Sequence, residues 1–297
     1  MKLSKLFSLL ALTVFTLSSC GDDDTAPTTT TLNASFDNLE NLGEGFAYEG
    51  WIIVDGAAIS TGVFTVDDQG AVSQTGFDVE KADLEAASAF VLTIEPSPDN
   101  DPAPSDVHIL AGDISGTSAN LTISHGAALA TSFTGATGDF ILATPTDDDA
   151  TNEKSGVWFI NNSSGMAVAG LDLPALPASG WAYEGWAVIN GQPVSTGTFT
   201  TATGSDDAAP YSGTNDAPPF PGEDFLNNQP EGLTFPTDLT GAMIVISIEP
   251  VPDNSPNPFT LKPLAGAVPS DAVQGTTYSI DNIAASTYPS GSVNFEL

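Results

Sequence analysis

Two pairs of glutamates recur at matching places in the sequence and are the residues best suited to chemistry. Glu49 stands in the string Ala-Tyr-Glu-Gly-Trp, and the same string surrounds Glu184, 135 residues later. Glu95 and Glu249 each stand in an Ile-Glu-Pro string, 154 residues apart. Paired carboxyl groups, Glu49 with Glu95 or Glu184 with Glu249, could perform acid/base or glycosidase chemistry if one pKa were raised. The alternative is that each glutamate bonds to the backbone, and presence at both places favours this structural role.

A second candidate site is a loop rich in oxygen ligands. Asp99, Asp101 and Asp106 lie around a proline-rich segment, and carboxylates of this kind suit Ca²⁺. The spacing Asp-x-Asp-x-Asp-Gly is absent, so solvated loop carboxylates are the alternative. No other cofactor is expected. His108 and His125 have no metal-ligand spacing and are expected at exposed positions on strand faces.

A third candidate lies where the two halves of the sequence differ. The segment 200–241 carries 19 residues that the first half lacks, and it is rich in proline. A long loop in a compact domain is usually functional or disordered, and the aromatic residues here favour partial order. Tyr211, Phe220 and Phe225 could stack on sugars or anchor a partner, or could simply cover an edge of the second domain.

The elements that position these residues are short strands. Residues 46–54 are aromatic and β-branched and end at Asp55-Gly56, and Asn190-Gly191 takes the same place in the second half. Both dipeptides favour a type I′ hairpin turn. Strand alternation places Glu49 and Trp51 on one face. Residues 79–89 are the one helical candidate.

The pattern predicts an all-β fold of two tandem β-sandwich (Ig-like) domains that arose by internal duplication. We place the first sandwich at residues 32–145 and the second at residues 146–297, with the longer loop at 200–241.

The N-terminal residues predict export and a lipid anchor. Residues 1–19 combine two lysines with a short apolar core, as a signal peptide does, and Leu-Ser-Ser-Cys resembles a bacterial lipobox ending at Cys20. The alternative is an ordinary secretory signal with an incidental cysteine. Residues 20–31 are an acidic Thr/Pro tether. We therefore expect a protein anchored by lipid at the outer membrane or cell surface.

The charge balance excludes one class of partner. The chain has 5 Lys+Arg, none of them arginine, against 38 Asp+Glu, and a net charge of −33. Such a surface repels phosphate backbones, so no nucleic-acid binding is expected. Self-repulsion on this scale requires screening by salt, which favours a marine or halophilic source.

The repeated strings resemble the extracytoplasmic C-terminal domain of anti-sigma-K factors. In that family a strand with Tyr and Trp leads through a glycine turn to a Gly-x-Phe strand, and a Glu-Pro strand precedes a proline-rich loop. The positions that carry the resemblance and mark the fold are Tyr48, Glu49, Trp51, Gly62, Phe64, Glu95 and Pro96, and again Tyr183, Glu184, Trp186, Gly197, Phe199, Glu249 and Pro250.

The resemblance implies a sensor-type sandwich. The family's sigma-binding segment and transmembrane helix have no counterpart here, so no direct sigma-factor binding is expected. We expect a non-enzymatic, lipid-anchored envelope protein that acts in binding or sensing, with an envelope protein or a glycan as partner. The alternatives are an adhesive, structural or glycan-binding surface lipoprotein, and a glycoside hydrolase that uses the paired carboxylates.

Overall fold

The structure is a computed structural model that describes residues 28–253 and 255–297. Its regular structure is almost entirely β-strand, which confirms the all-β expectation. Helix α1 (Lys81–Ala86) is shorter than the expected 79–89, because residues at both ends of that range join strands. In the described residues no helix has the length and apolar character needed to cross a membrane. The predicted signal, residues 1–19, and Cys20 lie outside the described range.

The first sheet has eight strands in the order β3-β2-β5-β6-β7-β19-β1-β4. Its outermost strands, β3 and β4, contact each other, so the sheet folds back on itself around a core. In that core Phe64 stacks on Phe36 with ring centroids 5.0 Å apart. The strands are β1 (Thr29–Asp37), β2 (Phe46–Val54), β3 (Ala57–Phe64), β4 (Gly76–Glu80), β5 (Ala87–Pro96), β6 (His108–Asp113), β7 (Ser118–Thr122) and β19 (Ser290–Asn294).

Strand β1 corrects the expected extent of the tether. The tether was placed at residues 20–31, but Thr29 already pairs with Glu80 of β4. The Thr-rich run can form a strand because its side chains alternate between the two faces of the sheet, with Leu32 fully buried.

The second sheet has nine strands, in the order β14-β13-β16-β17-β18-β8-β9-β15 with β12 paired to β8. Strands β14 and β15 again contact each other. The strands are β8 (Thr137–Leu142), β9 (Gly156–Trp158), β12 (Leu171–Asp172), β13 (Trp181–Ile189), β14 (Gln192–Phe199), β15 (Gly222–Asp224), β16 (Met243–Pro250), β17 (Leu264–Ala267) and β18 (Tyr278–Asn282), and a separate pair is β10 (Ile160–Asn161) with β11 (Val168–Ala169).

The two sheets share one local design. We call the first sheet with its loops the first unit and the second sheet with its loops the second unit. The order β3-β2-β5-β6-β7 corresponds to β14-β13-β16-β17-β18. Each hairpin has an irregular register between its Gly and Trp, at Gly50/Trp51 and at Gly185/Trp186. Asp55 and Asn190 have φ of 50° and 54°, as the predicted type I′ turns require.

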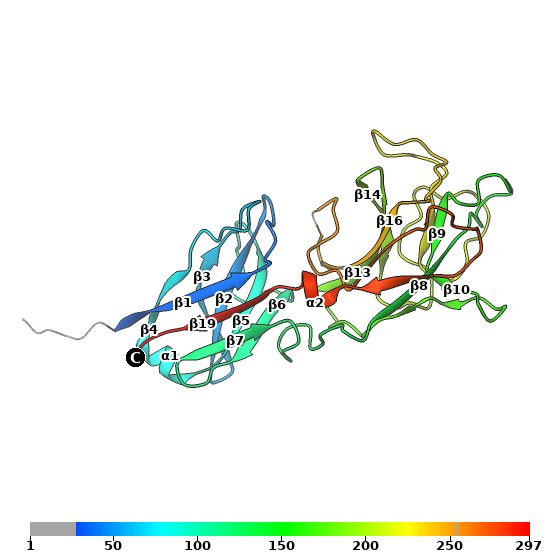
Figure 1. Cartoon of the computed structure of the whole chain (residues 1–297). Helices are drawn as coiled ribbons and strands as arrows, with labels where there is room; N and C mark the ends of the chain where they lie inside the picture. The colour runs from blue at the N-terminus through cyan, green and yellow to red at the C-terminus, as the bar shows by residue number, and fades with distance from the viewer. Residues whose placement is uncertain (1–27, 254) are drawn as a thin grey trace, which may run out of the picture.

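Two strands have exchanged places between the units. Strand β8 follows β7 in the chain but pairs with β18 and β9 of the second unit. Strand β19 follows β18, reached through helix α2 (Ala284–Thr287), but pairs with β7 and β1 of the first unit. Figure 1 shows β19, drawn in red, between strands of the first unit. The boundary expected between 145 and 146 therefore does not separate the sheets, because each sheet contains one strand from the other side of it.

Candidate functional site

The repeated Tyr and Trp lie on opposite faces of their strand. Tyr48 points into the core and donates a hydrogen bond to the main-chain oxygen of Glu40 at 2.9 Å. Tyr183 does the same with Pro174 at 2.6 Å. Pro96 and Pro250 end their strands. These residues fix the strand between the core and the preceding loop, which is a structural role.

In the first unit Glu49 and Glu95 lie on the sheet face that carries Trp51, and both are covered. Glu49 accepts a hydrogen bond from the Ser60 hydroxyl. Glu95 accepts one from Thr93, and both of its oxygens lie close to the Ser105 N–H, at 2.9 and 3.1 Å. Glu49 is 7% exposed and Glu95 2% exposed. Desolvation by burial raises the pKa of Glu49. Every carboxyl oxygen of Glu95 has a partner, which supports the structural role predicted for this pair.

Trp51 in the first unit is sealed in the same way. Its indole donates to Thr93 at 2.8 Å, and its ring packs in a small buried cluster. The chain after β7 supplies Ala128 to that cluster. These contacts cover the Trp51 ring.

In the second unit the equivalent residues form a chain of hydrogen bonds. Trp186 donates to the Ser247 hydroxyl at 2.7 Å, and Ser247 donates to Glu249. The Phe259 N–H donates to the same Glu249 oxygen, Oε1, at 2.9 Å. Glu184 accepts from Ser195. Burial raises the pKa of Glu184 to about 7 and that of Glu249 to about 8. Phe259 takes the place of Ser105 in the second unit. The Phe259 N–H bonds to one oxygen of Glu249, whereas the Ser105 N–H lies close to both oxygens of Glu95.

A third carboxylate joins this pair. One carboxylate oxygen from each of Glu184, Glu249 and Asp253 lies within 4.8 Å of the others. Glu184 and Glu249 are buried and Asp253 is exposed. Within residues 28–253 and 255–297 this is the one such group of three or more metal-ligating side chains. The sequence pointed to each glutamate but not to Asp253 as their neighbour.

A cavity of about 310 Å³ adjoins Glu184. Pockets for small ligands begin at about this size. Trp186, which corresponds to the sealed Trp51, lines this cavity. Tyr211 and Pro230 close it from the long loop, and the other lining residues are Glu184, Gln192, Pro193, Val194, Ser195, Ser255 and Pro256.

The three loop aromatics have three different positions. Tyr211 lines the cavity. Phe225 is fully buried, with its ring centroid 6.0 Å from Tyr211 and 5.5 Å from Phe235, so it is a core residue and not a ligand contact. Phe220 packs on a separate cluster around Trp158. Phe220 and Phe225 pack in apolar clusters and so fix the loop against the domain, which agrees with the expected covering role.

The loop also brings acids into the core that the sequence reasoning missed. Glu223 and Asp224 are fully buried. Asp224 accepts from the Trp158 indole at 2.7 Å and from the Thr146 N–H at 2.9 Å. Burial raises the pKa of Glu223 and of Asp206 to about 7. A Glu-Asp pair beside glycine and proline looks like a loop in the sequence, and only the pairing of β15 with β9 reveals its burial.

The predicted calcium ligands do not come together. Asp99, Asp101 and Asp106 are exposed and form no close group within the described part of the chain. Asp99 accepts from the N–H of Asp101 at 2.9 Å, and Asp101 accepts from that of Ala103 at 3.0 Å. These carboxylates stabilise local turns, so the alternative of loop carboxylates is the better description.

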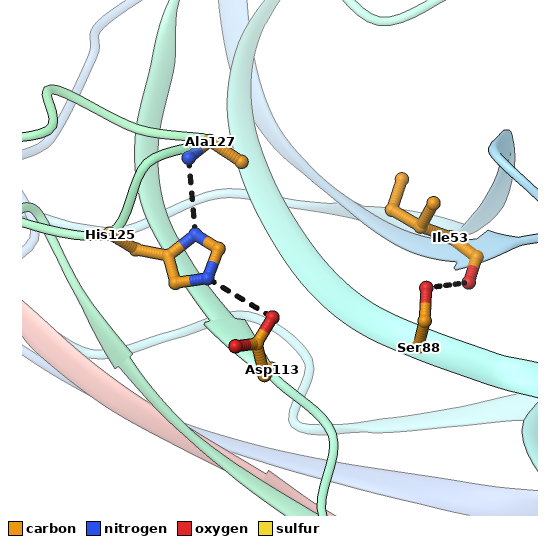
Figure 2. Close-up of polar contacts among 5 residues, drawn as sticks. All are labelled: Ile53, Ser88, Asp113, His125 and Ala127. Carbon is orange, nitrogen blue, oxygen red and sulfur yellow. Dashed lines mark hydrogen bonds and ion pairs between the residues drawn. The ribbon is translucent and has the colours of Figure 1, made fainter.

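The histidines are structural. His125 accepts from the Ala127 N–H at 3.1 Å through Nδ1, and its Nε2 lies 3.3 Å from Asp113, as Figure 2 shows. His108 contacts the Ala127 carbonyl at 2.8 Å. Both therefore hold the segment that covers Trp51. Both are partly buried, so the expected exposure is wrong, because that segment lies over the strand face.

The comparisons with known proteins support the resemblance. Neither a curated protein nor a solved structure matches the chain. A family model does match, over a range that runs from before β1 to the start of β6 in the first unit. Residues 25–108 match the family described as "Anti-sigma-K factor rskA, C-terminal".

Proposed function

We propose that this chain is a non-enzymatic, lipid-anchored protein of the cell envelope whose second unit binds a ligand or partner, in a binding or sensing role. The observation that carries the proposal is the contrast between two equivalent tryptophans. The Trp51 ring packs against Ala128, whereas Trp186, although itself only 3% exposed, lines a cavity of about 310 Å³. The cavity beside Trp186 supports a binding role for the second unit.

The lining favours a ligand with both polar and apolar faces. Tyr211 and the prolines offer apolar contact, while Gln192, Ser195 and Glu184 offer hydrogen bonds. Sugars combine these two requirements, so a glycan is the second candidate partner.

The test is a comparison of two matched substitutions in the chain without its predicted signal. Gln192→Trp places a large side chain in the cavity lining. Ala57→Trp is the control, because Ala57 begins β3 just as Gln192 begins β14. Both proteins would be used for capture from envelope extracts and for a glycan array. We expect Gln192→Trp to abolish capture that Ala57→Trp retains, and equal capture by both variants would contradict the proposal.

The lipid anchor is tested separately. Cys20→Ser removes the acceptor for the predicted acyl chains. We expect the variant to leave the membrane fraction, and a membrane-bound variant would contradict the anchor without bearing on the cavity.

A further inference from the structure

We propose that Glu184, Glu249 and Asp253 form a binding site for a hard divalent cation, with Ca²⁺ as the expected ion. Calcium takes oxygen ligands at about 2.3–2.6 Å, so two ligands of one ion are at most about 5 Å apart. The three carboxylate oxygens meet this condition, lying within 4.8 Å of one another. Two strands and the loop after β16 supply them, from Glu184 on β13, Glu249 on β16 and Asp253 beyond it.

The second observation is one carboxyl oxygen that lacks a partner. Glu249 is 1% exposed. Its Oε1 accepts from Ser247 and Phe259, while Oε2 is buried without any hydrogen-bond partner among the described residues. A buried carboxyl oxygen without a partner is costly. Oε2 is the oxygen of Glu249 that remains available to a ligand, which distinguishes this group from acidic residues that water solvates.

Lys262, a cation close to Glu249, does not fill this role. It lies close enough to Glu249 for their charges to attract. Its ammonium, however, donates a hydrogen bond to the main-chain oxygen of Phe259 at 2.6 Å. Within residues 28–253 and 255–297 no lysine forms an ion pair with any of the three carboxylates. When all three carboxylates are ionised they repel one another, and a divalent ion relieves that repulsion directly.

The first unit provides an internal comparison. Glu49, Glu95 and Asp99 hold the equivalent positions, yet in the described residues their oxygens form no close group. The Ser105 N–H lies 2.9 and 3.1 Å from the two oxygens of Glu95, so that neither is free. The same three residue types therefore give a satisfied structural pair in one unit and an available cation site in the other. Although Glu184 borders the cavity, the proposed cation binding does not depend on whether the cavity also binds a ligand.

The experiment uses terbium, a luminescent substitute for calcium, with the chain lacking residues 1–20 and no other ligand added. The Trp186 indole is two hydrogen bonds from Glu249, so excitation of tryptophan should sensitise bound Tb³⁺. About 0.5 M NaCl screens non-specific attraction to the acidic surface. We expect saturable emission that CaCl₂ displaces, together with a heat of Ca²⁺ binding by calorimetry.

Two matched variants decide the assignment. Asp253→Asn removes an exposed ligand without burying a new group, and Asp99→Asn makes the same change in the first unit. We expect Asp253→Asn to weaken the affinity at least about tenfold, and Asp99→Asn to leave it unchanged. Absence of saturable binding, or equal effects of the two variants, would overturn the proposal. Circular dichroism of both variants checks that the fold is retained.

Discussion

Gly291 of β19 lies opposite Leu121 of β7, although the whole second unit separates them in the chain. The same relationship holds in the second unit, where Gly138 of β8 lies opposite Ile280 of β18. Strand β19 lies between β7 and β1 in the first sheet, and β8 takes the equivalent place between β18 and β9 in the second. Neither sheet is complete until the other unit has supplied a strand, so we expect the two units to unfold in one transition.

The exchanged strand can be tested by Gly291→Val. A Cβ at Gly291 would lie 2.8 Å from the Phe36 ring and from the main-chain oxygen of Ser35. Overpacking of this kind costs about 1–3 kcal/mol. Hydrogen exchange should show protection lost in β1 and β7, far from position 291 in the sequence. Gly126→Ala is the control, since nothing lies within 4 Å of its added methyl. Loss confined to β17 and β18 would contradict the exchange.

The buried loop aromatic predicts a large loss of stability. Phe225 is fully buried against Tyr211 and Phe235, and its N–H donates to the Ser155 carbonyl at 2.7 Å. We expect Phe225→Ala to reduce the free energy of unfolding by about 3–5 kcal/mol, measured in urea. Met166→Ala, at a side chain that is 72% exposed, should change it by less than about 0.5 kcal/mol. A loss below about 1 kcal/mol for Phe225→Ala would contradict its place in the core.

Stability should fall as the pH rises through neutrality. Burial raises the folded-state pKa of Glu223 and Asp206 to about 7, above the ordinary values of 4.5 and 3.8. Between these values the folded chain holds protons that the unfolded chain releases, so the stabilisation from protonated Glu223 and Asp206 is complete below about pH 4 and is lost progressively as the pH rises to about 7. We expect a higher melting temperature at about pH 5.5 than at about pH 8.

The control for this prediction is a pair of glutamine variants. Glu223→Gln should flatten the dependence on pH, because an amide does not titrate. Glu231→Gln, at an exposed position in the same loop, should leave it as it was. A melting temperature that rises from pH 5.5 to pH 8 in the unchanged chain would show that other groups dominate.

Salt should stabilise the chain strongly. With a net charge of −33, self-repulsion opposes the compact state and is screened as the Debye length shortens to about 3 Å at 1 M salt. We expect the melting temperature to climb steeply between low salt and about 2 M NaCl. A neutral osmolyte at equal osmolality is the control, and a flat dependence on salt would remove the case for a halophilic adaptation.

The sequence was sufficient for the two repeated hairpins and their turns. The Asp55-Gly56 and Asn190-Gly191 pairs require a left-handed backbone, and alternation placed Glu49 with Trp51 because the period of a strand is two. Such signals are local, so they can be recognised without knowledge of the tertiary fold.

The destination of β8 and β19 could not be predicted in the same way. Gly138 pairs with Ile280 just as Gly291 pairs with Leu121, so both strands place a glycine opposite a branched side chain. Register is set by such patterns, and here the pattern does not distinguish the sheets. Asp253 was likewise missed as a neighbour of Glu184, because a loop after a strand carries no periodicity to fix where its side chains point.

The exchanged strands also determine how the protein would carry a mechanical load. Thr122, at the end of β7, is paired with Ser290, at the start of β19, so both links to the second unit leave the first sheet at the same end. Strand β1, which starts at Thr29, begins at the opposite end of the sheet, and Figure 1 shows that end of β1 away from the second unit. Tension between Thr29 and the second unit would therefore pull β7 and β19 along their own axes, and the hydrogen bonds of several ladders would share the force and have to break together.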